Sequence, residues 1–232
     1  MKQATLAPEI KKGEQDFSGK YSLERAEEYF RKHQHGSLSR RLSNWWETRM
    51  ARKALRLAGH PESILDLPCG TGRFWELLAA DPKRKLYAAD YSEAMLTVAR
   101  THRPAALVQR FEIFQSSAFA IQLPDQAVEN IFCMRLLHHI GEAEDRLRIL
   151  QEFHRVARET VCLSLWVDGN YKAWKRVRAE RRRPKRKRFQ NRFLHQRKTV
   201  EQEFDQAGFR IRAFVDFIPK YAMWRTYVLE KK

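Results

Sequence analysis

The sequence lacks long apolar runs and paired cysteines, and these absences exclude several classes of protein. No apolar stretch approaches the ~18 residues that a membrane-spanning helix needs, and the first residues show no apolar core of a secretory signal peptide. The three cysteines, Cys69, Cys133 and Cys162, have no C-x-x-C spacing, which argues against a disulfide framework or a zinc site. We therefore expect a cytoplasmic protein with no bound metal.

Acidic residues are scarce in one segment only. Residues 172–198 contain 14 lysines and arginines and a single acid, Glu180, so they carry a charge of +13 in a chain whose net charge is +17. The rest of the chain is nearly neutral. A cationic segment of this kind indicates an anionic partner and carries no information about the fold.

The 232 residues, 43% of them hydrophobic, suffice for one α/β domain with a full core. We expect a mobile tail over residues 1–20, a helical cap over 21–60 with helices at 23–33 and 38–57, and the main domain over 61–232. From residue 63 strands and helices alternate: the apolar pattern predicts strands at 63–67, 85–89, 111–115, 128–134, 160–167, 209–217 and 222–229, and helices at 73–80, 92–100, 143–158 and 199–206. The alternation predicts a Rossmann-like three-layer sandwich, with a mostly parallel seven-stranded sheet and one antiparallel strand.

The stretch Ile64–Phe74, ILDLPCGTGRF, places two glycines directly behind a strand. Without Cβ atoms, Gly70 and Gly72 allow backbone N–H groups to approach a ligand closely where a helix begins. The next strand ends in Asp90, 18 residues after Gly72. An acid in this place characteristically accepts hydrogen bonds from ribose hydroxyls, so the pattern predicts an adenosine-type cofactor.

Two common nucleotide sites do not fit. A dinucleotide fingerprint needs a third glycine where Trp75 stands, and no Gly-Lys-Ser/Thr follows as a phosphate-binding loop requires. The pattern that fits is acid-x-small-x-Gly-x-Gly, met by Asp66, Pro68, Gly70 and Gly72.

At these residues the chain resembles the class I S-adenosylmethionine (SAM)-dependent methyltransferases, particularly the group that includes the ubiquinone-biosynthesis methyltransferases. The resemblance covers Ser63 to Lys231. It extends to ADYSEAML at 89–96, SSAFAIQLPDQAVENIFCMRLLHHI at 116–140 and TVEQEFDQAGFRI at 199–211. It implies SAM as cofactor and S-adenosylhomocysteine (SAH) as product.

The resemblance also implies roles for residues at the cofactor. Asp66 and the glycine turn would hold the amino-acid part of SAM, and Asp90 the ribose. Tyr91 would stack on adenine, which the backbone N–H of Ala118, after Ser117, would also bind. Two departures from the family's pattern are Pro68, where glycine is usual, and a serine at 116 or 117 where an acid usually contacts adenine.

Residues just after the fourth strand normally face the acceptor in this family. Here they include Arg135, His138 and His139. A histidine could remove a proton from the acceptor near neutral pH, or the pair could simply pack the following helix. Arg135 could bind an anionic acceptor or form a structural ion pair.

Two further patterns are missing. There is no Asn/Asp-Pro-Pro-Tyr after the fourth strand, which methylation of exocyclic base amines uses. There is also no cysteine behind proline there, which RNA cytosine-carbon methylation needs.

The basic insertion, residues 171–198, is expected to select the acceptor, with candidate contacts Trp174, Arg181, Arg182, Lys185 and Arg186. Its cations alternate with aromatic residues, which suits an anionic membrane or phosphate-rich glycolipid, or else RNA. A protein partner or a merely solvated helix remain alternatives. Trp45 and Trp46, beside Arg41 and Arg49, either add a second surface of this kind or pack in the core.

The leading hypothesis is a SAM-dependent methyltransferase that O-methylates an anionic, phosphate-bearing acceptor. This would be an envelope glycolipid or lipopolysaccharide-core component at the inner membrane face, with the protein peripheral to that membrane. The alternatives are an RNA methyltransferase and a non-catalytic scaffold with a methyltransferase fold.

Overall fold

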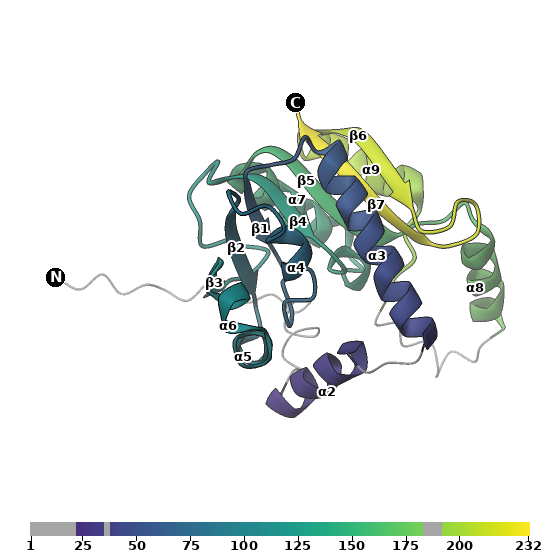
Figure 1. Cartoon of the computed structure of the whole chain (residues 1–232). Coiled ribbons are helices and arrows are strands. Elements are labelled where there is room, and N and C mark those ends of the chain that lie inside the picture. Colours follow the sequence, from purple (N-terminus) through teal and green to yellow (C-terminus); the bar gives the residue numbers. More distant parts are fainter. Residues whose placement is uncertain (1–21, 35–37, 183–191) are drawn as a thin grey trace.

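The computed structural model describes residues 22–34, 38–182 and 192–232 (Figure 1). The tail expected over 1–20 and two candidate contacts of the basic insertion, Lys185 and Arg186, lie outside these residues. The seven strands are β1 (Ser63–Asp66), β2 (Lys85–Asp90), β3 (Phe111–Gln115), β4 (Val128–Cys133), β5 (Ala157–Trp166), β6 (Phe209–Asp216) and β7 (Trp224–Lys231).

These strands form one sheet in the order β3-β2-β1-β4-β5-β7-β6. The pairs from β3 to β5 are parallel, whereas β7 runs antiparallel to both β5 and β6. The predicted sheet, with its single reversed strand, is therefore confirmed. The reversal follows from the short connection between β6 and β7, which leaves no room for a crossover helix.

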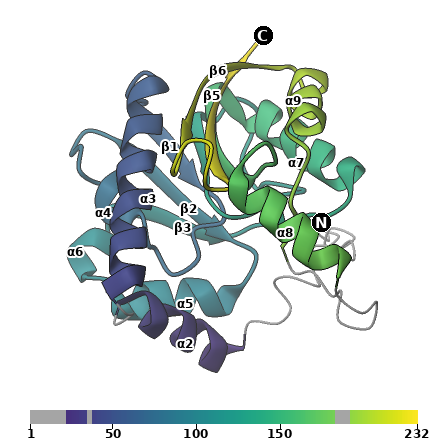
Figure 2. The same cartoon turned by 90° about the vertical axis from the view of Figure 1, so that its right-hand side faces the viewer.

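Helices cover both faces of the sheet (Figure 2). On one face lie α3 (Leu38–Leu57), α4 (Trp75–Leu78) and α5 (Glu93–His102); on the other lie α7 (Ala143–Val156) and α9 (Arg197–Gln206). Successive β1 residues alternate between the two cores: Ile64 packs with Trp75 of α4, and Leu65 packs with Phe153 of α7. Burial on both faces explains why the parallel strands read as near-continuous apolar runs.

The N-terminal helices join this body at two places. Helix α2 (Leu23–Gln34) packs through Ala26 against Met95 and Val98 of α5. Helix α3 lies on the sheet through small residues, among them Ala51 and Ala54. Because this alanine face already fills the contact, the tryptophans of α3 stay outside the core, Trp45 at 55% exposure and Trp46 at 37%.

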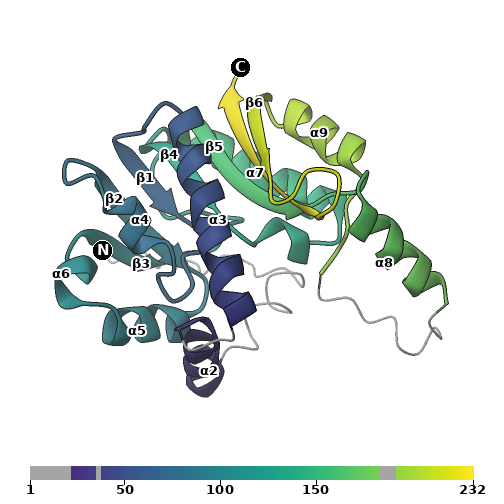
Figure 3. The ribbon, with the colours of Figure 1, turned by 45° about the vertical axis from the view of Figure 1, so that its right-hand side comes forward.

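Three local features differ from the sequence prediction. The helix expected over 73–80 is only α4, because the glycine turn extends further. Two short helices were not predicted, α6 (Ala105–Val108) and the 3-10 turn η1 (Leu137–His139). The basic insertion begins with α8 (Tyr171–Arg181), whose N-cap Asn170 accepts a hydrogen bond from the Ala173 N–H at 2.9 Å. Helix α8 projects from the carboxyl edge of the sheet (Figure 3).

Candidate functional site

A pocket opens where β1, β2 and β4 end, at the carboxyl edge of the sheet. Its space, open mouth included, is about 820 Å³. Its walls come from the glycine turn, from the ends of β2 and β4, and from α2: Tyr29, Leu67, Pro68, Cys69, Gly70, Thr71, Arg73, Phe74, Asp90, Tyr91, Met95, Ser116, Ala118, Met134, Arg135 and Leu136. An open α/β sheet binds its ligands at this edge.

The glycine turn forms the floor of the pocket. Gly70 and Gly72 adopt positive φ values of +55° and +71°, where side chains are strained. A Cβ on Gly70 would meet nothing within 4 Å, whereas a Cβ on Gly72 would lie 2.7 Å from the Trp75 ring. The backbone at Gly70 is therefore open to a ligand, and the one at Gly72 is closed by packing.

Asp90 ties the turn to the next helix. Its carboxylate accepts hydrogen bonds from the Gly70 N–H at 2.8 Å and the Ser92 N–H at 2.9 Å. Asp66 lies behind the turn, outside the pocket lining. Burial, together with the charge of Asp90, raises the pKa of Asp66 well above its ordinary value, and its Oδ2 has no hydrogen-bond partner among the residues that the structure describes. Asp66 is therefore buried outside the pocket lining, whereas Asp90 is one of the lining residues.

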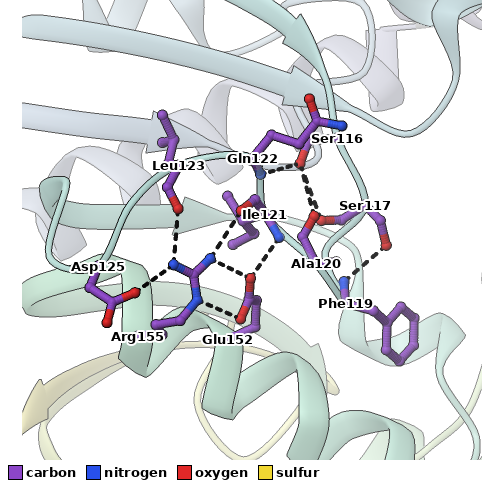
Figure 4. Close-up of polar contacts among 10 residues, drawn as sticks. All are labelled: Ser116, Ser117, Phe119, Ala120, Ile121, Gln122, Leu123, Asp125, Glu152 and Arg155. Atoms are coloured by element: carbon purple, nitrogen blue, oxygen red, sulfur yellow. Dashed lines mark hydrogen bonds and ion pairs between the residues drawn. The ribbon is translucent and has the colours of Figure 1, made fainter. Parts of the chain in front are cut away.

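The far end of the pocket is made by Tyr91, Ser116 and Ala118. Ser117 points elsewhere, because its hydroxyl accepts a hydrogen bond from the Phe119 N–H at 3.0 Å. The loop after β3 is held by the Ser116 hydroxyl, which accepts from the Gln122 N–H at 3.0 Å (Figure 4).

A charged cluster from α7 fixes the same loop (Figure 4). Arg155 donates to the carbonyls of Ile121 and Leu123 at 3.0 and 2.9 Å, and to the carboxylates of Glu152 and Asp125. Glu152 in turn accepts from the Ile121 N–H at 2.7 Å. Sequence reasoning missed this support, because nothing local in the sequence links residue 155 to residue 121.

The other end of the pocket contains two arginines that share one carboxylate. Arg135 donates to both oxygens of Glu47 on α3, at 2.5 and 3.1 Å, and Arg73 lies 2.8 Å from the same carboxylate. Burial opposes ionisation of Glu47, but the charges of Arg73 and Arg135 outweigh it and lower its pKa. The group therefore carries a surplus positive charge in a largely buried wall.

Residues 64–160 match the family described as methyltransferase domain. The structure of magnesium protoporphyrin IX methyltransferase from Synechocystis, solved with bound SAH, superposes with a TM-score of 0.68 over 89% of this chain and 93% of that one, at 14% identity. Residues 64–160 are thus similar to methyltransferase domains, and the fold of the described chain is that of class I SAM-dependent methyltransferases. The fold, the family and the SAM cofactor of this class agree with the sequence prediction.

Two curated relatives match the methyltransferase domain. A malonyl-[acyl-carrier protein] O-methyltransferase from Methylococcus capsulatus is 37% identical over 108 residues, 43% of this chain and 38% of the relative. A demethylmenaquinone methyltransferase from Geobacillus stearothermophilus is 29% identical over 108 residues, 44% of each. The match thus spans about two fifths of each relative's length.

The pocket of the methyltransferase domain fits SAM in its residues. The open space beside the backbone at Gly70 leaves room for the amino-acid part of SAM, and the carboxylate of Asp90 can accept hydrogen bonds from the two ribose hydroxyls. Tyr91 and Ala118 form the end that suits adenine. Pro68 also lines the pocket, and its contact with the cofactor stays a prediction. Asp66, Gly72 and Ser117 support the walls without lining them.

The two histidine candidates, His138 and His139, are not among the residues that line the pocket. His138 is buried, stacked on Trp166 and edge-on to Trp224. Burial and the neighbouring charges lower its pKa well below the ordinary value. His139 packs against His138. Of the three predicted catalytic residues, the structure places only Arg135 in the pocket wall, so a proton-accepting role for either histidine stays a prediction.

The predicted acceptor contacts on α8 lie outside the methyltransferase pocket. Trp174 is 58% exposed beneath Arg178, and Arg181 and Arg182 are exposed at the end of the helix. Tyr171 stacks on Tyr221 of the β6–β7 turn. The same turn meets α3, where Trp46 contacts Phe217. We call this group the aromatic edge: Trp45, Trp46, Tyr171, Trp174, Phe217 and Tyr221.

The two buried histidines of this region predict how stability depends on pH. Burial lowers the pKa of His195 to about 4, and the pKa of His138 is also lowered. In the unfolded chain both would titrate near pH 6.5. As the pH falls, the unfolded state therefore binds protons before the folded state does. We expect the free energy of unfolding to be highest above about pH 6.5 and to fall towards pH 4.

Urea unfolding at pH 7.0, 5.5 and 4.5 measures this loss. The His195 Nε2 lies 3.2 Å from the Leu137 carbonyl oxygen, and the amide of His195→Gln keeps a donor for that carbonyl. This variant should lose less stability over the same pH range. Equal losses in the two proteins would assign the acid sensitivity to other groups.

Proposed function

We propose that this chain is a SAM-dependent methyltransferase that O-methylates an anionic acceptor. The observation that carries the proposal is the continuity of one pocket. It joins the glycine turn and Asp90 at one end to the cationic pair Arg73 and Arg135 at the other. A cofactor and an anionic acceptor bound at the two ends would meet in the middle.

When bound, SAM supplies a methyl group already activated on a sulfonium. The protein then has to align the reactants and exclude water. Asp90 and the turn at Gly70 would orient the cofactor, while Phe74, Met134 and Leu136 give the acceptor end apolar walls. Tyr29 of α2 closes this end, so the helical cap is part of the site.

The finer part of the proposal concerns the acceptor's source. The aromatic edge and the cations of α8 lie on the sheet edge where the pocket opens, as they would in a protein that takes a phosphate-bearing envelope glycolipid or lipopolysaccharide-core component from an anionic membrane. No described helix is long and apolar enough to cross a bilayer. Peripheral contact through the aromatic edge and the cations of α8 is the membrane association that we propose.

RNA is the second candidate, favoured by the same cations and exposed aromatic rings, which can stack on bases. It predicts a steep loss of binding with salt. A non-catalytic scaffold is the third, and it predicts that SAM does not bind at all.

Purified protein, methyl-labelled SAM and a fractionated bacterial lysate test the proposal. We expect label in the envelope lipid and glycolipid fraction, with SAH as the other product. Label in RNA would overturn the acceptor class and leave the methyltransferase function standing. Absence of SAM binding in a separate titration would overturn the function itself.

A further inference from the structure

The acceptor end of the pocket contains features that define what it binds. Arg135 follows β4 with a φ of +68°, a conformation that is strained for a residue with a side chain. The backbone is held there by the N–H of Arg135, which donates to the Ser164 hydroxyl at 3.0 Å. The guanidinium is held in the wall by its two hydrogen bonds to Glu47, and it also lies 5.4 Å from the Trp224 ring.

Arg73 adds one unsatisfied donor group. Its Nη1 is buried and has no hydrogen-bond partner within the described ranges, whereas its Nη2 lies 2.8 Å from the Glu47 carboxylate. Burial lowers the pKa of Arg73, with Glu47 opposing that shift. Buried donors without acceptors are costly, and a ligand with oxygen acceptors would remove that cost.

Arg73, Arg135 and Glu47 form a trio whose positive and negative charges do not balance. Two guanidinium groups face one carboxylate, so the wall is short of one negative charge. A bound monoanion would complete it, whereas a neutral alcohol would not.

A second, smaller cavity adjoins this end and shares Phe74, Met134 and Arg135 with the main pocket. Met50, Phe74, Met134 and Trp224 make most of its wall apolar. Its free space is only about 20 Å³, so the apolar body of a ligand whose anionic head meets the arginines would lie against Phe74, Met134 and Leu136 in the main pocket.

No histidine or lysine is among the described residues that line either cavity. Tyr29 lines the main pocket and is a side-chain hydrogen-bond partner of Arg135. Cys69 is buried, which raises the pKa of its thiol well above the ordinary value, and the two arginines make Glu47 a weak base. An acceptor oxygen that is already ionised would need none of them.

We propose that the methyl-accepting group is a carboxylate on an apolar body, bound by Arg135 and Arg73, and that the product is a methyl ester. This inference rests on the proposed function. In the reaction an acceptor oxygen forms a bond to the methyl carbon while the sulfur–methyl bond breaks. The bonding pair stays on sulfur, the sulfonium becomes the neutral thioether of SAH, and no proton is transferred.

Binding to the protein saturated with SAH tests the site, because the cofactor's own carboxylate is then already bound. The probes are benzoate, phenyl phosphate and benzyl alcohol, and calorimetry measures the affinity of each one. We expect benzoate to bind, benzyl alcohol to bind at least tenfold more weakly, and Arg135→Gln to weaken benzoate at least tenfold. Equal binding of benzoate and benzyl alcohol, or unchanged benzoate binding in Arg135→Gln, would overturn the proposal.

Two further variants keep the test independent of folding. Glu47→Gln removes the competing carboxylate and should strengthen benzoate binding several-fold, an effect opposite to that of damage. Arg225→Gln breaks a similarly buried bidentate pair, with Asp216, that lines neither cavity, and it should leave benzoate binding unchanged. Weaker binding in Glu47→Gln, or an equal loss in Arg225→Gln, would make the trio a structural ion pair.

The labelled product gives a chemical readout. Mild alkali hydrolyses a methyl ester and releases volatile labelled methanol, whereas a methyl ether keeps its label. Released methanol is the expected result, whether the carboxylate belongs to a free acid or to a lipid. Labelled product that resists alkali would overturn the carboxylate and leave the methyltransferase function standing. Failure to bind SAH would instead refute the proposed function.

Discussion

Replacing Asp90 with alanine is expected to lower SAM affinity by at least 100-fold. Each hydrogen bond to a charged group contributes about 1.5–3 kcal/mol, and ribose offers two hydroxyls to the Asp90 carboxylate. Two such bonds lost correspond to a change of that size or more, since about 1.4 kcal/mol is a factor of ten. The variant also removes the acceptor of the Gly70 N–H, so the turn itself loosens. Calorimetric titration with SAM and with SAH measures the loss.

Asp125→Ala is the matched control for Asp90→Ala. Its carboxylate also accepts a charged hydrogen bond, from Arg155, but it lies on the outer side of the loop after β3 and its side chain is 75% exposed. We expect SAM affinity within twofold of the parent protein. An Asp90→Ala protein that is folded and binds SAM normally would remove Asp90 from the cofactor site.

Alanine is expected to have a different main effect at each glycine of the turn: a loss of stability at Gly72 and a loss of SAM affinity at Gly70. Gly72→Ala should cost about 2–5 kcal/mol of stability. It combines the strain of a positive φ, about 1–2 kcal/mol, with a clash that costs about 1–3 kcal/mol. The clash is with Trp75, which is fully buried and stacked on Phe111, so its ring has no room to move.

Gly70→Ala should cost only the strain of its positive φ, because its Cβ would meet no protein atom within 4 Å. That Cβ would project into the cofactor end of the pocket, and we expect SAM affinity to fall at least tenfold in a folded protein. Urea unfolding and SAM titration of both variants separate the two effects. A Gly70→Ala protein with normal SAM binding would show that the cofactor does not pass over this turn.

Sequence patterns were sufficient for the cofactor half of the site because its parts are close along the chain. The glycine turn and Asp90 belong to one strand–helix–strand unit, and the geometry of that unit places them together in any sheet of this type. Ser92, in the same unit, is the N-cap of α5, where its hydroxyl accepts from the Met95 N–H.

The acceptor half depended on the tertiary structure. Arg135 and Glu47 are 88 positions apart, and only the packing of α3 on the sheet brings the acid between the two arginines. The burial of His138 between Trp166 and Trp224 is equally invisible in the sequence, where an LHH stretch reads the same whether it faces a pocket or a core. The sequence by itself therefore determined the sheet and its cofactor turn, which arise from local periodicity and short-range motifs. Which charged groups share the acceptor wall was decided by long-range packing, because the ionisation and hydrogen bonding of a side chain depend on neighbours that the fold alone supplies.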